Sequence, residues 1–368
     1  MTWYFLRPDA ISVWKNKEVV RRLSHYKAVL DGKRPARYRV VKRIPVEYSE
    51  EDSLKELFKI HEEKSKEFWE IYDEIATGKR SIEDLKYPPK SFLDLKITIV
   101  KKIVEKCHLC EWRCGVNRWR GEKGVCGLDY KARVASAFLH MGEEAPLVPS
   151  GTIFFTGCSF RCVFCQNWDI STMPENGVEV TPKELAEIAT KLYLKGAKNI
   201  NYVGGNPDQQ LHVIVESLKY MDVNVPLLWN SNMYMTEEAL NILLDIVDIW
   251  LPDFKYGNNK CAKRLSGIDN YFDVISRNHK KACMKGDMII RHLVLPNHLD
   301  CCTKPVLKWI ADNCKYVLVN IMDQYRPEHF VARYPERWPD IARSLHGEEI
   351  EEAYRYADEL GLCWRPVS

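Results

Sequence analysis

The sequence of 368 residues predicts an α/β protein built on a partial (β/α)6 barrel, with a cysteine-rich segment before the barrel and α-helical extensions. From residue 150 onward, short apolar segments alternate with segments of helical pattern, which is typical of βα units and a parallel sheet. Polar or ligand-type residues follow each apolar segment, and a purely structural barrel would not need them there. Because chemistry in βα barrels lies at the C-terminal ends of the strands, we expect the functional site at that edge.

Residues 1–96 are expected to form a basic and helical N-terminal extension. Residues 1–46 hold twelve Lys or Arg and three Asp or Glu, a net charge of +9 that would suit phosphate, a lipid headgroup or an acidic protein. We favour the alternative of a solvated surface that is balanced by the acidic stretch after it. Ser53 and Glu56 have the spacing of a capping box, which predicts an amphipathic helix over 53–77.

The next segment, residues 97–149, is rich in cysteine. Within it, "CHLCEWRCGVNRWRGEKGVCG" at 107–127 has the spacing C-x2-C-x3-C-x11-C. Four thiols in so short a stretch indicate a metal site. The ligand set suits structural zinc or a second [4Fe–4S] cluster, with a role as a clamp or as an electron relay. The predicted ligands are Cys107, Cys110, Cys114 and Cys126.

The barrel is expected to span residues 150–322 and to contain six strands. Each predicted strand is an apolar run, and the segments between the runs carry helix signals. One example is the capping box of Thr181 and Glu184, with Pro182 at the first helical position. The six predicted strands cover residues 152–156, 199–205, 226–232, 247–255, 287–296 and 315–322.

Residues 323–368 are expected to form a C-terminal lid and helix. The stretch 323–347 is rich in aromatic residues, Arg and Pro, and it follows the sixth strand, so it should lie near the mouth of the barrel. There it would act as a lid or a substrate-binding loop, with an ordinary packed extension as the alternative. Residues 348–361 predict a final helix that ends at Gly361.

The composition restricts the class of protein. A hydrophobic content of 46% with no apolar run of about 18 residues predicts a globular chain without a transmembrane span. The start, "MTWYFLRPDA", lacks the apolar region of a signal peptide, so we expect a cytoplasmic protein, with peripheral membrane contact as an alternative. A net charge of only +3 does not favour nucleic acid as a partner. Thirteen cysteines in a reducing compartment indicate metal binding or catalysis.

Three cysteines follow the first predicted strand in "GCSFRCVFCQN" at 157–167, and they are Cys158, Cys162 and Cys165. Structural zinc sites and ferredoxin-type clusters use four protein ligands. Three thiolates on a four-iron cluster would leave one iron open to a substrate or cofactor. Buried structural cysteines, or a zinc site completed from elsewhere in the chain, are the alternatives.

The remaining cysteines show no ligand spacing, and we interpret them as packing residues. Two of them are adjacent in sequence, and adjacent side chains point in different directions in regular structure. These cysteines are Cys261, Cys283, Cys301, Cys302, Cys314 and Cys363.

The C-x3-C-x2-C loop after the first strand of a βα barrel resembles the radical S-adenosylmethionine (SAM) superfamily. "CVFCQNWDIS" is similar to the subgroup related to pyruvate formate-lyase activating enzyme, which includes poorly characterised prokaryotic iron–sulfur homologues. The resemblance covers residues 107 to about 326 and implies a radical SAM barrel. It implies that Cys158, Cys162 and Cys165 hold a [4Fe–4S] cluster whose open iron binds SAM.

The resemblance also implies contacts to SAM from other strand ends. Phe164 would lie against the adenine, and Gly204 with Gly205 would approach the SAM amino group. The family often has Glu after the glycine pair, but this chain has Asn206, whose side-chain contact would be weaker. Asp253 could instead pair with its neighbour Lys255 at the barrel rim. The further residues implied to contact SAM are Asn230, Asn232, Asp253, Lys255 and Arg291.

The resemblance implies an oxidoreductase or activase that uses radical chemistry. A one-electron donor of the ferredoxin or flavodoxin type would reduce the cluster, and reductive cleavage of SAM would yield methionine and a 5′-deoxyadenosyl radical. This radical would abstract hydrogen from an unactivated C–H bond, while the protein supplies orientation and a dry cavity.

The sequence leaves three substrate hypotheses open. The first is a glycine in a partner protein, as in glycyl-radical activases. The second is a lipid or another hydrophobic or small molecule, with radical C–C bond formation as one reaction and the basic N-terminal region on anionic headgroups. The third is a metal-stabilised binding protein without catalysis, for which Asn206 is the only support.

Overall fold

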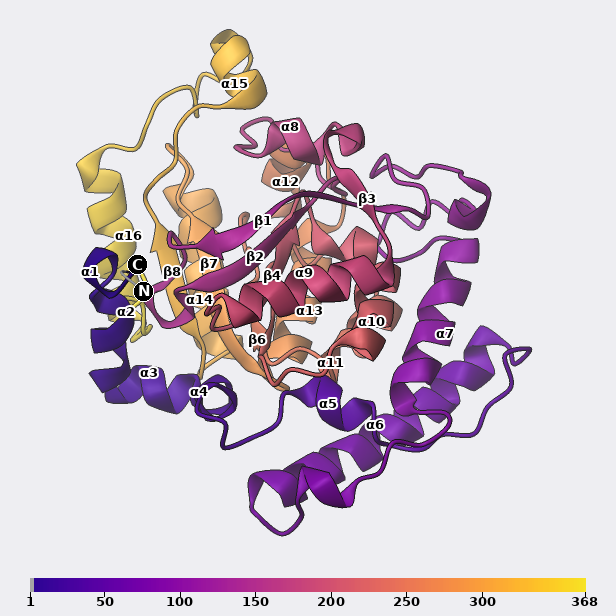
Figure 1. Cartoon of the computed structure of the whole chain (residues 1–368). Helices are drawn as coiled ribbons and strands as arrows, with labels where there is room; N and C mark the ends of the chain where they lie inside the picture. Colours follow the sequence, from indigo (N-terminus) through magenta and orange to yellow (C-terminus); the bar gives the residue numbers. More distant parts are fainter. Residues whose placement is uncertain (1–2) are drawn as a thin grey trace.

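The computed structural model describes residues 3–368, with side chains from residue 5 onward. Its centre is an eight-stranded sheet in the order β3-β1-β2-β4-β5-β6-β7-β8 (Figure 1). Strands β2, β4, β5, β6, β7 and β8 pair in parallel in this order. Strand β1 is antiparallel to β2, and β3 is antiparallel to β1. The prediction of an α/β fold with a six-stranded parallel barrel sheet is therefore confirmed.

All six predicted barrel strands are present, although several are shorter than predicted. Buried strands of a parallel sheet have both faces covered, so they are continuous apolar runs that a sequence shows clearly. In β5, for example, all three residues are buried. The parallel strands are β2 (Ser150–Phe155), β4 (Ile200–Gly204), β5 (Leu227–Trp229), β6 (Ile249–Trp250), β7 (Asp287–Leu293) and β8 (Leu318–Met322).

Helices surround this sheet (Figure 1). The predicted capping box at the start of α9 is present, because the Glu184 amide donates to Thr181 Oγ1 at 3.3 Å and the Thr181 amide donates to Glu184 Oε2 at 2.8 Å. The helices that follow the barrel strands are α9 (Pro182–Leu194), α10 (Leu211–Ser217), α11 (Glu237–Leu244), α12 (Asn259–Ser266), α13 (Tyr271–Cys283) and α14 (Lys304–Asn313).

Two antiparallel strands extend the sheet beyond β2, and the sequence did not predict them. They are β1 (Ala132–His140) and β3 (Val178–Val180). His140, the last residue of β1, pairs with Ser150, the first residue of β2, so the connection 141–149 lies at the N-terminal end of the barrel strands. This connection supplies side chains to the barrel interior, as described below.

The N-terminal helices cover the N-terminal ends of the barrel strands. They are α1 (Trp3–Leu6), α2 (Asp9–Ser12), α3 (Lys17–Arg22), α4 (Ser24–Leu30) and α5 (Arg37–Val41). Val19, Leu23 and Tyr26 are fully buried in one apolar cluster with barrel residues such as Ile249 and Leu318. Burial of these side chains fixes the segment to the base of the barrel.

Several basic side chains of this segment hydrogen-bond to backbone carbonyls near the barrel strands. They do not form the solvated surface that we favoured. Arg22 Nη1 donates to the Lys315 and Val317 carbonyls at 2.7 and 2.9 Å. Arg37, which is buried, donates from Nη1 to the Val247 carbonyl at 2.6 Å. These charges stabilise loop carbonyls that have no partner in the sheet.

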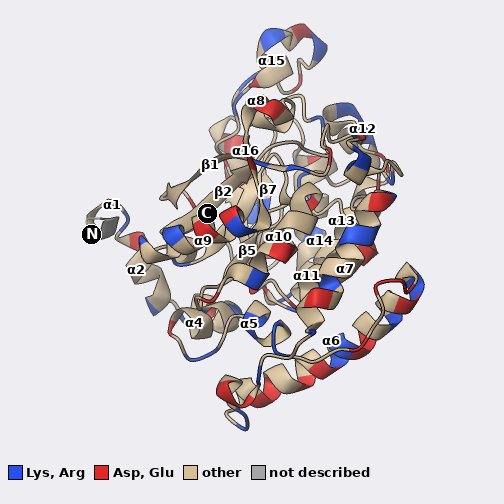
Figure 2. Cartoon of the chain, turned by 45° about the vertical axis from the view of Figure 1, so that its right-hand side comes forward, with Lys and Arg blue, Asp and Glu red and all other residues tan. Residues whose placement is uncertain are grey.

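Two long helices pack side by side at the edge of the molecule, α6 (Leu54–Ala76) and α7 (Phe92–Glu105) (Figure 1). The predicted capping box of α6 is present: the Ser53 amide donates to Glu56 Oε2 at 2.8 Å. Lys and Arg alternate with Asp and Glu along its exposed face (Figure 2). No helix among residues 3–368 combines the length and the apolar composition that crossing a bilayer requires.

Helix α7 runs across residue 97, the predicted start of the cysteine-rich segment, and β1 lies inside that segment. The division of the chain into 1–96, 97–149, 150–322 and 323–368 stays a prediction.

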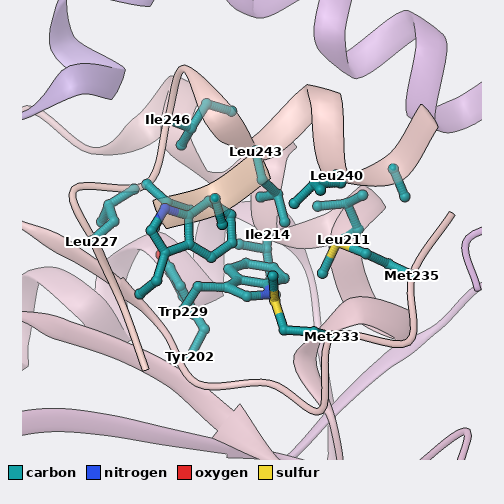
Figure 3. Close-up of a cluster of buried hydrophobic side chains, with 14 of the residues drawn as sticks. Tyr202, Leu211, Ile214, Leu227, Trp229, Met233, Met235, Leu240, Leu243 and Ile246 are labelled. Carbon is teal, nitrogen blue, oxygen red and sulfur yellow. The ribbon is translucent and has the colours of Figure 1, made fainter. Parts of the chain in front are cut away.

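A buried cluster between the sheet and helices α10 and α11 fixes the end of β5 (Figure 3). Trp229 is fully buried there, and its indole Nε1–H donates to Asp208 Oδ1 at 2.9 Å. The same Asp208 oxygen accepts from Ser231 Oγ at 2.7 Å. The core packing therefore sets the position of residues 230–232, which reach the barrel mouth.

Candidate functional site

A pocket of about 430 Å³ lies inside the barrel and opens at the C-terminal ends of the parallel strands. Residues from the ends of all six parallel strands line it, as the strand pattern led us to expect. Every residue that we predicted for the cysteine triplet and for SAM contacts lies on its wall. They are Cys158, Cys162, Phe164, Cys165, Gly204, Gly205, Asn206, Asn230, Asn232, Asp253, Lys255 and Arg291.

Hydrogen-bonding groups from different parts of the chain lie against the sulfurs of the three cysteines after β2. The Phe160 amide donates to Cys158 Sγ at 3.3 Å, Ser266 Oγ lies 3.0 Å from Cys162 Sγ, and Ser171 Oγ lies 3.5 Å from Cys165 Sγ. Hydrogen bonds to ligand sulfurs are characteristic of iron–sulfur sites, where they hold the thiolates and tune the potential. The donor set therefore fits a [4Fe–4S] cluster at this loop.

Burial and neighbouring thiols oppose ionisation of these cysteines in the metal-free chain. Burial, with the adjacent Cys165, raises the pKa of Cys162 to about 12. Burial likewise raises the pKa of Cys158 and of Cys165. Only the thiolate binds metal, so loading this site requires the metal to displace protons from buried thiols.

The glycine pair after β4 has a structural requirement of its own. A Cβ on Gly204, where φ is +123°, would lie 2.2 Å from the Phe155 amide nitrogen. A Cβ on Gly205 would lie 2.2 Å from the Gly157 carbonyl oxygen. The end of β4 therefore packs backbone against backbone on the loop that leads to Cys158, and only glycine fits at both positions.

The asparagines at the strand ends form bonds within the protein. Asn206 Oδ1 accepts from the Asn232 amide at 3.0 Å, and Asn206 Nδ2 donates to Gln209 Oε1 at 3.0 Å. Asn232 Nδ2 lies 3.6 Å from Cys158 Sγ and 3.3 Å from Ser159 Oγ. Asn232 thus contacts a sulfur of the triplet, a role we did not anticipate, and Asn206 joins two strand ends.

Asp253 and Lys255, at the end of β6, form an ion pair on the pocket wall. Burial would lower the pKa of Lys255, but Asp253 and the nearby Cys162 outweigh burial and raise it. The alternative that these two residues pair at the barrel rim is thus the arrangement in the structure. Lys255 remains a cation next to the triplet, where it would offset thiolate charge.

Arg291 of β7 binds two buried carboxylates, which no local pattern in the sequence predicted. Its Nε and Nη2 donate to the two oxygens of Glu144 at 2.7 and 2.8 Å, and Nη2 also pairs with Glu143. Asn320 Nδ2 donates to Glu144 at 2.7 Å, and Asn201 Nδ2 donates to Glu143 at 2.8 Å. Both glutamates come from the connection between β1 and β2, so this charged network forms the floor of the pocket.

Glu143 and Arg291 of the floor stay ionised near neutral pH. Burial alone would raise the pKa of Glu143, but Arg291 and then His140 outweigh it and lower the pKa to about 2. The pKa of Arg291 is raised, because its attraction to Glu144 and Glu143 exceeds the effect of burial. The sequence signal for this floor was an acidic pair, "EEAP", a few residues before a buried strand.

The C-terminal segment packs over the cysteine loop. Phe164 and Tyr325 pack edge to face with ring centroids 5.7 Å apart, so Phe164 is held on the pocket wall. The Val331 amide donates to the Val163 carbonyl at 3.1 Å, and α15 (His329–Arg333) lies beside α8 (Trp168–Ser171) (Figure 1). The final helix, predicted at 348–361, is α16 (Gly347–Glu359). The segment therefore lies beside the cysteine loop, and its role as a lid or a substrate-binding loop stays a prediction.

The four cysteines of the 107–127 stretch lie in a loop next to the triplet. Cys107, Cys110 and Cys126 are buried, and Cys114 is half-buried. A hydrogen bond from the Cys107 thiol lowers the pKa of Cys114 to about 5. Trp112 Nε1 donates to the Ser159 carbonyl at 2.8 Å, which joins this loop to the loop of the triplet.

Our interpretation of the other cysteines as packing residues needs two corrections. Cys261, Cys301 and Cys302 lie together with His298 as a group of potential metal ligands. Cys283, at the end of α13, forms a disulfide with Cys314. Both arrangements join residues distant in sequence, so local spacing did not show them.

Comparison with known proteins places this site in context. The Radical SAM superfamily matches residues 152–310. An uncharacterized protein of Methanocaldococcus jannaschii is 44% identical over 93% of this chain and 98% of its own length. Pyruvate formate-lyase 1-activating enzyme of Escherichia coli K12 is 26% identical over 32% of this chain and 50% of the enzyme. The crystal structure of Streptococcus suis SuiB bound to precursor peptide SuiA covers 56% of this chain and 46% of that chain, with 15% identity and a TM-score of 0.40.

Proposed function

Because this chain belongs to the radical SAM superfamily, we propose that it is an enzyme that cleaves SAM reductively and abstracts hydrogen from an unactivated C–H bond of a substrate bound in the barrel pocket. Family membership supports SAM-dependent radical chemistry as the general activity. The substrate, the activase-like role and the residues that carry the reaction belong to the proposal.

Cys158, Cys162 and Cys165 would hold a [4Fe–4S] cluster. When bound, the cluster and SAM supply the electron transfer and the radical. The protein positions these groups and excludes water. Asn232 and Ser266 orient two of the ligand sulfurs, and Lys255 offsets their charge. Phe164 offers an apolar wall, packed on Tyr325, for the adenine ring.

One observation carries the proposal: the triplet, the glycine pair and the polar residues of all six strand ends surround one pocket. These residues are spread over more than 160 positions, from Cys158 to Gln324, and the barrel brings them together. A structural metal site would not require a cavity beside its ligands, whereas binding of a cofactor and a substrate does.

We propose that the part of the substrate that enters the pocket is polar, either a small molecule or a peptide segment. The pocket floor carries the buried Glu143 and Glu144, which pair with the half-buried Arg291, and Asn320 stands beside them. A lipid chain at that position would leave these charges without water and with no new partners, which costs free energy. A peptide segment includes the glycine of a partner protein, so this choice retains the activase-like role.

We further propose that Cys107, Cys110, Cys114 and Cys126 hold a second metal group, either a [4Fe–4S] cluster or zinc. Its contact with the triplet loop through Trp112 supports a role as a clamp or as an electron relay.

The activity is tested by reconstituting the full chain anaerobically with iron and sulfide and adding SAM and dithionite. We expect release of 5′-deoxyadenosine, detected by liquid chromatography, and no release from Cys162→Ala. Cys363→Ser is the matched control, because Cys363 lies outside the pocket, and it should retain activity. Reconstituted protein that binds four irons at the triplet but releases no 5′-deoxyadenosine would support the non-catalytic alternative.

The substrate class is tested with a deuterated cell extract separated into protein, polar small-molecule and lipid fractions. Hydrogen abstraction transfers deuterium to 5′-deoxyadenosine, which mass spectrometry detects. We expect label from the protein fraction or from the polar fraction. Label from the lipid fraction alone would reject a polar substrate and leave the proposed radical chemistry intact.

A further inference from the structure

A group of four potential metal ligands lies outside the barrel pocket. The sulfurs of Cys261, Cys301 and Cys302 and a ring nitrogen of His298 all lie within 4.8 Å of one another. Neither the triplet nor the four cysteines at 107–127 contribute to this group. His298 and Cys302 are buried, Cys261 is half-buried and Cys301 is exposed, so the group lies just under the surface.

The local backbone explains how two adjacent cysteines face the same ligand position. Residues Leu299–Thr303 form a turn of π-helix, which is wider than an α-helical turn and is frequent at functional sites. In this turn Cys301 Sγ and Cys302 Sγ lie 3.8 Å apart. Cys261 approaches from the first turn of α12, where its amide donates to the Asn258 cap at 2.8 Å. Regular α-helix or strand would have separated the two adjacent sulfurs.

We propose that Cys261, His298, Cys301 and Cys302 bind one zinc ion in a tetrahedral site. Zinc with three thiolates and one imidazole places sulfurs about 3.8 Å apart and sulfur and nitrogen about 3.6 Å apart, given its usual bond lengths. The recorded S···S distances are 3.8 and 3.9 Å. The Sγ···Nδ1 distances from His298 are 3.3 Å to Cys301 and 3.7 Å to each of the other two cysteines.

The surroundings of the histidine match those of a metal ligand. Nδ1 of His298 faces the three sulfurs, and Nε2 lies 2.9 Å from Asp340 Oδ2. A carboxylate on the second ring nitrogen fixes the tautomer in which Nδ1 is free to bind metal. Arg264 pairs with the same carboxylate, and Asn258 Nδ2 donates to Cys261 Sγ at 3.4 Å. The ligands are thus held in place by partners from three segments.

Other uses of these thiols fit the distances less well. A disulfide requires sulfurs about 2.05 Å apart, whereas Cys261 and Cys301 are separated by 3.9 Å. In a [4Fe–4S] cluster each ligand sulfur binds a different iron, so the ligand sulfurs stand farther apart than around one ion. Hydrophobic packing does not explain a thiol as exposed as that of Cys301.

A four-ligand site leaves no position for a substrate, which makes it structural. It joins α12 to the segment after β7 and, through Asp340, to the C-terminal segment that packs on the cysteine loop. The other end of α12 carries Ser266, whose hydroxyl contacts Cys162 of the triplet at 3.0 Å. Zinc at one end of this helix would therefore stabilise the cysteine loop at the other end.

The test is metal analysis of the full chain, purified without added zinc and then dialysed against a weak chelator. We expect the zinc content to fall by about one ion per chain in Cys301→Ser, chosen because this exposed thiol contributes little to the core. Cys363→Ser is the matched control and should retain zinc. Asp340→Asn should keep the fold and weaken zinc binding by about 10- to 100-fold, measured by competition with a chromophoric chelator.

Two further variants separate this site from the other cysteines. The Cys158→Ala/Cys162→Ala/Cys165→Ala variant should lose the iron of the triplet and keep this zinc, so failure of the proposed radical chemistry does not affect the result. Cys114→Ser should also keep this zinc. Cobalt(II) added to apoprotein of the Cys114→Ser variant should give the intense visible absorption of a tetrahedral thiolate site, and Cys301→Ser in the same background should lower it. Zinc content unaffected by Cys301→Ser, or iron at these four residues, would overturn the proposal.

Discussion

The side chain of Asn206 lies between two strand ends rather than free in the pocket. Its oxygen accepts from the Asn232 amide and its nitrogen donates to Gln209, so both halves of the amide are used. A glutamate at this position could not donate to Gln209 and would place a negative charge near the buried Asp208. The departure from the family pattern therefore has a local structural reason, and it gives no support to a loss of catalysis.

Arg291 is the residue on which the pocket floor depends. It compensates the charges of two carboxylates that are 4% and 1% exposed at their side chains. A buried ion pair adds little to stability compared with apolar residues, but removal of one partner leaves uncompensated charge. The floor is thus stable only while Arg291, Glu143 and Glu144 are all present.

We therefore expect Arg291→Ala to lower the free energy of unfolding by about 3–5 kcal/mol at pH 7, measured by urea denaturation. The loss should shrink as the pH falls, because the freed carboxyls then take up protons. Glu143 of the unaltered protein, by contrast, keeps its stabilising charge until the pH falls toward its lowered pKa of about 2.

The control replaces the whole set by neutral residues of similar size, Arg291→Met with Glu143→Gln and Glu144→Gln. This variant should recover most of the lost stability. If it is no more stable than Arg291→Ala, the floor does not act as a charge-compensated unit.

At the scale of elements, the parallel strands were predictable because burial on both faces makes them apolar throughout. The helices α6 and α9 were predictable from their capping boxes, which the structure contains. Strand β1 has three exposed and four half-buried residues among its nine, and β3 has only three residues, so neither showed a clear hydrophobic period. Antiparallel edge strands of this kind carry weaker signals.

The residues of the candidate site also fall into those that the sequence predicted and those that it did not. Residues that follow directly from a strand, such as Cys158 and Asn232, were predictable from position alone. Glu144 was not, because it reaches the pocket from the opposite end of the barrel. The group around His298 was not, because Cys261 joins it from 37 positions away and a π-helical turn aligns the rest. Tertiary placement, rather than local pattern, creates both features.

Ser266, the last residue of helix α12, connects Tyr256 to the cysteine triplet through hydrogen bonds. Tyr256 Oη lies 2.6 Å from Ser266 Oγ, and Ser266 Oγ lies 3.0 Å from Cys162 Sγ. Because a thiolate can only accept, Ser266 donates to Cys162 when the sulfur is ionised, and Tyr256 then donates to Ser266. Such a bond withdraws electron density from the ligand sulfur and favours the reduced cluster.

We expect Ser266→Ala to make the reduction potential of the proposed cluster more negative, measured by a redox titration followed by electron paramagnetic resonance. Tyr256→Phe should cause a smaller shift in the same direction, because it leaves the serine in place. Ser276→Ala, on the neighbouring helix α13, is the control and should leave the potential unchanged. A potential unaffected by Ser266→Ala would show that this hydroxyl does not act on the cluster.

At the scale of the whole molecule, the two ends of the barrel differ: one is open as a pocket and the other is covered by the N-terminal segment. The C-terminal ends of the strands carry the pocket, and the N-terminal segment covers the other end with an apolar cluster and with basic side chains bonded to carbonyls. The basic segment therefore lies away from the pocket mouth. A lipid-facing role for it would not bring a membrane to the place where the reaction is proposed.

The dependence of stability on pH also belongs to the whole molecule, because three buried histidines in different elements share one response. Burial lowers the pKa of His279 and of His292 to about 4, and that of His212 to about 3. The unfolded chain binds protons at these residues near pH 6.5 and the folded protein does not, so the folded state is favoured above that pH and loses this advantage as the pH falls toward 4.

We expect the midpoint of thermal unfolding to fall between pH 7 and pH 5, and the fall to be smaller in His279→Gln. Glutamine can donate to the Ile275 carbonyl, which lies 2.8 Å from His279 Nδ1, but it cannot take up a proton. The full effect of one such histidine is a few kcal/mol, reached only near its folded pKa. His346→Gln, at an exposed position, is the control. It should leave the fall in the unfolding midpoint between pH 7 and pH 5 unchanged. An equal fall in His279→Gln and in the unaltered protein would assign the acid sensitivity to other groups.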